Sequence, residues 1–163
     1  MDDHQIQGAL LEAKFRALQE KIDEMFTHYY IPINQETVPQ VVRKTVNALT
    51  TTISHRLGIH PPRVVYFQEE TRKHREYVKR YSVRDWRFFK HVGPRGLFGK
   101  ANPRSREIYI HKNLKNPDAI IEVVAHEIRH IWQFEQGMSN RPEDELENDA
   151  LHFGRQIRRE YCN

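Results

Sequence analysis

Two histidines lie four residues apart in the stretch Val123–Gln133, and a glutamate directly follows the first of them. Side chains four apart on an α-helix point the same way, so His126 and His130 would present two imidazoles that a single Zn²⁺ can bridge. Glu127 lies one residue round the helix, where its carboxylate can reach a water on the metal without being a ligand. This HExxH pattern predicts metal-assisted hydrolysis of an amide bond.

The chemistry divides between the metal and the glutamate. Zn²⁺ lowers the pKa of a bound water to about 7 and polarises a carbonyl group. Glu127 would take the proton as general base and pass it to the leaving amine. The alternative is a helix whose histidines only hydrogen-bond to backbone or carboxylate groups. Apolar residues on both sides, such as Val124 and Ile131, favour the metal interpretation, because chance copies of the pattern more often fall on exposed surface.

A hydrolytic zinc site uses three protein ligands and keeps one coordination position open. The chain has a single cysteine, Cys162, so the ligands must be histidines or carboxylates. His152 is the only histidine after His130. The acidic cluster that follows the HExxH stretch supplies Glu143, Asp144, Glu145, Glu147 and Asp149. The third ligand is therefore predicted to be a carboxylate on the last helix.

Helical geometry gives a modest preference among these carboxylates. The apolar stripe of the last helix runs through Leu146, Ala150, Phe153 and Ile157. Glu147 borders this stripe on the side shared with Gly154, Asp149 borders the opposite side, and Glu145 points largely away. The small residues at positions 150 and 154 would let this helix approach the HExxH helix closely. Geometry alone leaves Asp149 open as a ligand, or as a group that orients a ligand histidine.

The sequence HEIRHIWQ followed by ELENDALHFG resembles the gluzincin-type zinc metallopeptidases, and most closely their small cytoplasmic bacterial and phage members of the ImmA/IrrE type. Their third ligand is a glutamate in an E-x-x-A pattern followed by an aromatic and a small residue. Here that pattern reads Glu147, Ala150, Phe153 and Gly154, so the resemblance implies Glu147 as the third ligand. Arg129 stands where zincins usually hold an uncharged residue, and it would face solvent or pair with a carboxylate.

The resemblance covers about residues 96–154. It implies a zincin-like α+β fold, Zn²⁺ as cofactor, and endopeptidase activity on a protein or peptide. It includes the hairpin before the HExxH helix, whose edge strand binds extended peptide in gluzincins. The donor to the transition-state oxyanion is usually a histidine or tyrosine outside the motif. The candidates for that role are Tyr109, His111, His152 and Tyr161.

Two helices are predicted in the first third of the chain. The first, Gln5–Tyr29, has an apolar stripe at spacings of three and four, made of Leu11, Phe15, Leu18, Ile22, Met25 and Tyr29. Core packing is the favoured interpretation of this stripe, and a dimer seam is the alternative. The second helix runs from about Val38 to Leu57, with Val42, Leu49, Ile53 and Leu57 inward and Gly58 as its C-cap.

The middle of the chain predicts strands. The β-branched and aromatic run Val64–Phe67 favours a buried strand. Two extended segments around the turn ANPRS predict a hairpin, whose second strand, Glu107–His111, alternates at period two. The basic stretch between them fits either a helix and a strand or two helices.

Clear start and stop signals bound the helices that would carry the site. Asn116 is a natural N-cap, Pro117 suits the first helical position, and Gly137 would close the end of the HExxH helix. A final helix is predicted from about Pro142 to Tyr161. The whole is expected to be a single domain over residues 1–163, with residues 1–34 as an N-terminal helical extension.

The basic segment of residues 72–100 suggests a different function. It carries ten lysines and arginines against only Glu76 and Asp85, and such a concentration can recruit an acidic partner. Aromatic residues alternate with these charges, namely Tyr77, Tyr81, Trp86, Phe88 and Phe89. Stacking surfaces for nucleic acid are built this way, but a small domain also needs aromatics for its core. The alternative function is nucleic-acid binding with a structural or vestigial zinc site.

Composition sets the outer limits. The 163 residues suffice for one domain with its own core, and 38% hydrophobic against 29% charged residues is a globular balance. Apolar runs are too short to span a bilayer. The acidic N-terminal sequence does not resemble a secretory signal, so a cytoplasmic location is expected.

Overall fold

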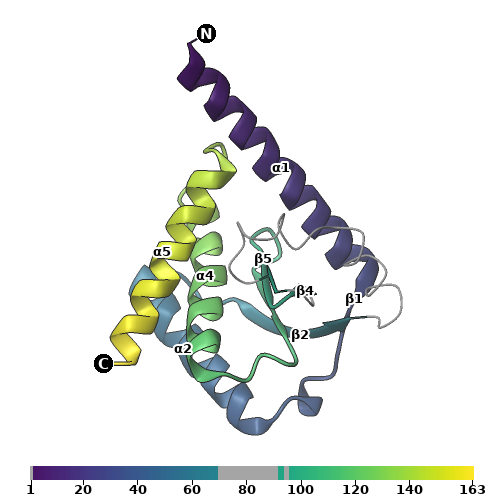
Figure 1. The fold of residues 1–163 in the computed structure, drawn as a ribbon. Helices are drawn as coiled ribbons and strands as arrows, with labels where there is room; N and C mark the ends of the chain where they lie inside the picture. The colour runs from purple at the N-terminus through teal and green to yellow at the C-terminus, as the bar shows by residue number, and fades with distance from the viewer. Residues whose placement is uncertain (1, 70–91, 94–95) are drawn as a thin grey trace.

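The computed structural model describes residues 2–69, 92–93 and 96–163. In this part of the chain four α-helices accompany a small mixed sheet, which is the α+β class predicted from the sequence (Figure 1). The helices are α1 (Asp3–Tyr29), α2 (Gln40–Leu57), α4 (Pro117–Glu135) and α5 (Glu143–Tyr161), with a short 3-10 helix η1 (Gln35–Thr37). The strands are β1 (Tyr30–Pro32), β2 (Arg63–Glu69), β3 (Val92–Gly93), β4 (Gly96–Leu97), β5 (Gly99–Asn102) and β6 (Glu107–His111).

The four-stranded sheet has the order β1-β2-β6-β5. β5 and β6 form the predicted antiparallel hairpin, in which Gly99 is opposite Ile110. β2 and β6 run parallel, with Val64 opposite Ile108, and β1 pairs with β2 antiparallel. Among the described strands β5 therefore ends the sheet. β3 and β4 form a separate two-stranded pair.

Helix α4 lies at the centre of the fold. It packs against α5 and α2, and it also contacts β5 and β6 (Figure 1). Ile108 and Ile110 share one face of β6 and belong to the same core cluster as Val124 and Ile128 of α4. This is the burial expected where an amphipathic helix covers one face of a sheet. The helix that carries the HExxH pattern is thus held on several sides.

Local signals fix the ends of the helices as the sequence predicted. The Asn116 side chain accepts hydrogen bonds from the backbone N–H groups of Asp118 and Ala119, at 3.0 and 3.2 Å. Gly58 follows α2 in the left-handed conformation, with φ of 69°. That conformation strains residues with a Cβ but not glycine. The C-cap role predicted for Gly58 is confirmed.

The predicted start of the second helix was wrong by two residues. Val38 is extended, with φ of −89° and ψ of 137°, and α2 begins at Gln40. Pro39 explains the difference, because a proline ring clashes with a preceding residue in the α conformation. Strand β1 and helix η1, which lie between the first two helices, were not predicted from the sequence.

The core interpretation of the stripe on the first helix was wrong for Leu11. Its side chain is 41% exposed, and Ile6 and Leu10 on the same part of α1 are exposed as well. In Figure 1 the N-terminal part of α1 extends beyond the rest of the described chain. The other members of the stripe lie outside the side chains that the structure describes. The dimer seam remains a prediction.

Most of the basic segment of residues 72–100 lies outside the described residues, and so do the expectations that rest on it. No helix within the described ranges combines the length and apolar character needed to cross a membrane.

Candidate metal centre

The middle of α4 brings the three HExxH residues together. His126, Glu127 and His130 each offer a ligand atom, and these atoms lie within 4.8 Å of one another. The two imidazole rings lie edge-on to one another, with 3.0 Å between their Nε2 atoms. His126 and Glu127 are buried and His130 is half-buried. The stop and start signals of α4 place all three residues away from its fraying ends.

Glu147 of α5 completes the cluster. Its Oε1 lies 3.0 Å from Nε2 of His130, and its Oε2 lies 3.3 Å from Nε2 of His126. The close approach of the two helices makes this possible. Ala150 is fully buried between them. A Cβ atom at Gly154 would lie only 2.8 Å from the backbone carbonyl oxygen of Glu122. The small residues at these two positions have the effect that the sequence predicted.

The other two carboxylates considered as ligands lie elsewhere. Glu145 is exposed. Asp149 accepts two hydrogen bonds from Arg129, at 2.8 and 3.0 Å. The Arg129 guanidinium also lies 3.8 Å from the ring centre of Trp132 and 4.9 Å from that of Phe153. Of the two expectations for Arg129, exposure to solvent or pairing with a carboxylate, the second is confirmed.

Mutual contact shifts the pKa values of the clustered groups. Burial by itself lowers the pKa of His130, but the neighbouring Glu147 carboxylate outweighs burial and raises it to about 9. Burial raises the pKa of Glu147, but the two histidines outweigh this and hold it well below its usual range. His130 and Glu147 thus form a buried ion pair at neutral pH when only protons compensate the charge.

The distances between the side-chain atoms of His126, His130 and Glu147 are suitable for binding a metal ion. Tetrahedral Zn²⁺ with ligand bonds of about 2.0–2.1 Å places neighbouring ligand atoms ~3.3 Å apart. The separations among Nε2 of His126, Nε2 of His130 and the Glu147 oxygens are 3.0, 3.0 and 3.3 Å. An imidazole Nε2 and a carboxylate oxygen each have a lone pair that can bind a cation. Two imidazoles and one carboxylate form a donor set that Zn²⁺ accepts.

Glu127 has different surroundings from Glu147. It is 4% exposed, and strand β5 passes directly over it: a Cβ atom at Gly99 would lie 3.1 Å from its Oε1 atom. Burial raises the pKa of Glu127, and the two histidines only partly oppose that shift. A carboxylate whose pKa is raised takes up a proton more readily, as a general base must.

The four candidates for the oxyanion donor are spread over the structure. His152 and Tyr161 are exposed. Tyr109 lies on the β6 face opposite Ile108 and Ile110, and its hydroxyl donates to Glu107 at 3.4 Å. His111 is buried and packs edge-on against the rings of Phe67 and Phe98.

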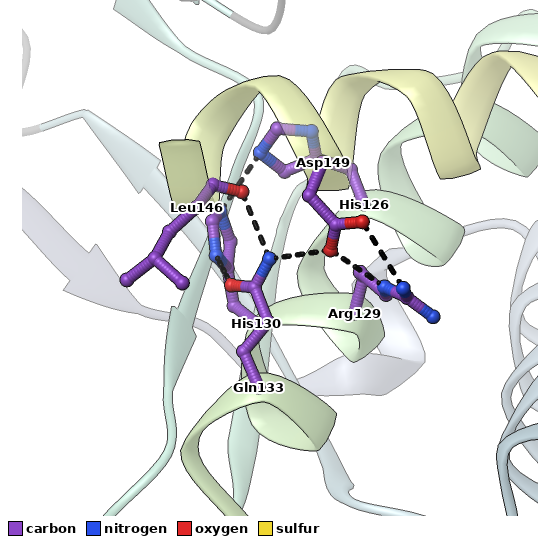
Figure 2. Close-up of polar contacts among 6 residues, drawn as sticks. All are labelled: His126, Arg129, His130, Gln133, Leu146 and Asp149. Carbon is purple, nitrogen blue, oxygen red and sulfur yellow. Dashed lines mark hydrogen bonds and ion pairs between the residues drawn. The ribbon is translucent and has the colours of Figure 1, made fainter. Parts of the chain in front are cut away.

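Gln133 was not among the site residues predicted from the sequence. It is 2% exposed, and its Oε1 atom lies 2.9 Å from Nδ1 of His130 (Figure 2). Residues three apart on a helix are neighbours, so its position three residues after His130 was a usable signal. Comparison with known proteins adds nothing to this geometry: no protein-family model matches the chain, and neither a curated protein nor a solved structure matches it.

Proposed function

We propose that the chain is a zinc-dependent metallopeptidase of the gluzincin type that hydrolyses a peptide bond in a protein substrate. The observation that carries the proposal is the close approach of Nε2 of His126 and Nε2 of His130 to each other and to the two carboxylate oxygens of Glu147, at separations of 3.0–3.3 Å. Glu147 is assigned as the third ligand because its oxygens contact both imidazoles. Glu127 is assigned as the general base, because it lies in the cluster but its Oε1 atom lies next to Gly99 of β5.

Each residue has a defined task in this scheme. Bound Zn²⁺ would supply Lewis acidity and bring the pKa of a water close to neutral. The carboxylate of Glu127 takes up a proton during attack and returns it to the leaving amine. Its burial beneath Gly99 keeps bulk water away and raises its pKa. The carboxylate can therefore hold the proton until the amine leaves.

Strand β5 offers a way to hold the substrate. It ends the sheet among the described strands and crosses Glu127 at Gly99. An extended peptide can add to such an edge through backbone hydrogen bonds. A peptide in that position would run past the general base, which accords with hydrolysis of an extended segment of protein.

The test measures metal and activity on the same protein. The purified chain should contain about one zinc per molecule by elemental analysis, and the double variant His126→Ala, His130→Ala should contain almost none. Glu127→Gln should retain the zinc and lose hydrolysis of fluorescein-labelled unfolded casein, since only the base is removed. Glu145→Gln, an exposed carboxylate on α5, is the matched control and should keep both properties.

Two results would refute the proposal. If the wild-type protein has no zinc after purification and takes none up by dialysis, the cluster is an ion pair and not a metal site. If zinc is bound but Glu127→Gln hydrolyses as fast as the wild type, the base has been assigned wrongly.

A further inference from the structure

The side-chain amide of Gln133 joins α4 to α5 directly beneath the candidate ligands. Its Oε1 atom lies 2.9 Å from Nδ1 of His130. Its Nε2 atom donates to the backbone oxygen of Leu146 and to Oδ2 of Asp149, both at 2.8 Å. Figure 2 shows that one amide group makes all three contacts. All the hydrogen-bonding capacity of the amide nitrogen is therefore used.

These contacts allow only one orientation of the amide. Leu146 O and the Asp149 carboxylate are acceptors, so they require the NH₂ group of Gln133. The reversed orientation would set an oxygen against both of them. The Gln133 oxygen must therefore face His130.

The orientation of the amide decides the tautomer of His130. A carbonyl oxygen accepts and cannot donate, so Nδ1 of His130 carries a hydrogen. In the neutral imidazole Nε2 then has the lone pair. That atom is the one that lies 3.0 Å from Nε2 of His126 and 3.0 Å from Oε1 of Glu147. Gln133 thus turns toward the ligand cluster the nitrogen that can bind a metal.

Asp149 and Arg129 hold Gln133 in turn. The guanidinium of Arg129 binds both oxygens of Asp149 and lies over the ring of Trp132. Asp149 accepts from the Gln133 amide, whose oxygen faces His130, so Asp149 reaches the histidine through Gln133.

We propose that Gln133 is a positioning residue of the metal centre: it fixes the Nδ1–H tautomer and the ring orientation of His130, while Asp149 and Arg129 fix Gln133. This inference rests on the proposed metal site. Groups that hydrogen-bond a ligand histidine typically change metal affinity by about 10–100-fold when removed. The same loss is expected here.

The experiment separates positioning from simple structural support by two substitutions of similar size. Gln133→Met removes the acceptor for His130 and both donors. Gln133→Glu keeps an oxygen toward His130 but disturbs the contacts to Leu146 and Asp149. A positioning role predicts that Gln133→Glu binds zinc within about threefold of the wild type, whereas Gln133→Met loses about 10–100-fold. Gln156→Met, at a half-buried position of α5 where the amide donates to Glu160, is the matched control and should bind as the wild type does.

Zinc affinity is measured on the full chain by competition with a chromophoric chelator, and thermal unfolding is recorded for each variant. A second readout is the Nδ1–H signal of His130 in ¹⁵N-labelled, zinc-loaded protein. That proton should exchange with water markedly faster in Gln133→Met than in the wild type or in Gln133→Glu.

Three results would overturn the inference. Equal zinc affinity in Gln133→Met and the wild type would sink it while leaving the metal site intact. Gln133 would be a purely structural link if the loss of zinc affinity in Gln133→Glu and Gln133→Met were simply proportional to the loss of thermal stability in each variant. A wild-type chain that binds no zinc would remove the metal site itself, and the inference with it.

Discussion

Gly154 of α5 lies against the backbone of Glu122 on α4 so closely that a Cβ atom would stand 2.8 Å from the Glu122 carbonyl oxygen. A backbone oxygen in the middle of a helix cannot move aside easily. The distance between the two helices is therefore set at this point. It also sets how far Glu147 can reach toward the histidines of α4.

Gly154→Ala should destabilise the protein by about 1–3 kcal/mol, the usual cost of overpacking a core. The gain in helix propensity, about 1 kcal/mol, offsets only part of it. Zinc affinity should fall too, because α5 must shift and carry Glu147 with it. Gly8→Ala is the control: a Cβ there meets nothing within 4 Å, so its effect on the free energy of unfolding should be neutral or favourable. Urea unfolding of both variants checks this.

Gly99→Ala should affect hydrolysis more than metal binding. A Cβ at this position would lie 2.5 Å from Cγ1 of Val123 and 3.1 Å from Oε1 of Glu127. Valine in a helix has one strongly preferred rotamer, so strand β5 must move away and leave Glu127 wetter. The variant should retain one zinc and lose most of its activity on casein. A variant as active as the wild type would show that β5 does not control the general base.

The three carboxylates of α5 should rank by their contacts. Glu147→Ala removes a ligand, so zinc affinity should drop by more than ~100-fold, beyond the range for groups that only support a ligand. Asp149→Ala should cost less, about threefold, because the Gln133 oxygen still faces His130. Glu145→Ala should change almost nothing. Chelator competition on the three variants gives the ranking, and a larger loss in Asp149→Ala than in Glu147→Ala would mean that the ligand has been misassigned.

The His130–Glu147 pair makes the stability of metal-stripped protein depend on pH. The pKa of His130 is raised from 6.5 to about 9, so its contribution is complete below pH 6.5 and is lost as pH rises through about 9. Thermal unfolding in chelator should therefore show a falling midpoint between pH 6.5 and 9. His130→Gln should flatten this decline, whereas His55→Gln, at an exposed position, should not. Zinc affinity should rise over the same pH range, because the metal displaces the proton.

Ser54→Ala should stabilise the protein. Ser54 is fully buried in α2, and its hydroxyl has no hydrogen-bond partner among the residues that the structure describes. Removing an unsatisfied buried hydroxyl and raising helix propensity should together add about 0.5–1.5 kcal/mol to the free energy of unfolding. Thr50→Val is the comparison, since the Thr50 hydroxyl donates to the Val46 carbonyl at 2.7 Å and its loss should bring no gain. A destabilised Ser54→Ala variant would contradict the assignment of an unpaired hydroxyl.

Features that depend on neighbours along the chain could be predicted from the sequence. The bounds of α4 follow from Asn116, Pro117 and Gly137, which act on their own turn of backbone. Helix geometry alone predicts that His126 and His130 lie on the same side of α4. The position of Glu147 needed one further condition, the close packing of two helices, and Ala150 and Gly154 signal it by their size.

Features that depend on distant parts of the chain could not be predicted from the sequence. The parallel pairing of Val64 with Ile108 joins segments more than 40 residues apart in the sequence, and period-two alternation says nothing about the partner strand. Leu11 shows a related limit: a stripe identifies the apolar side of a helix, but not whether anything covers it. Gln133 escaped notice because an uncharged polar residue on a helix usually reads as solvated surface.

All three proposed ligands come from one helical hairpin, since α4 and α5 are joined by residues 136–142 and His126 precedes Glu147 by only 21 positions. Closing so short a loop costs little chain entropy, and local contacts form early in folding. Strand β5, which encloses Glu127, needs the sheet and its long-range pairing. We therefore expect the nascent domain to capture its metal before the general base is shielded, so that hydrolytic competence arises only when the whole sheet has formed.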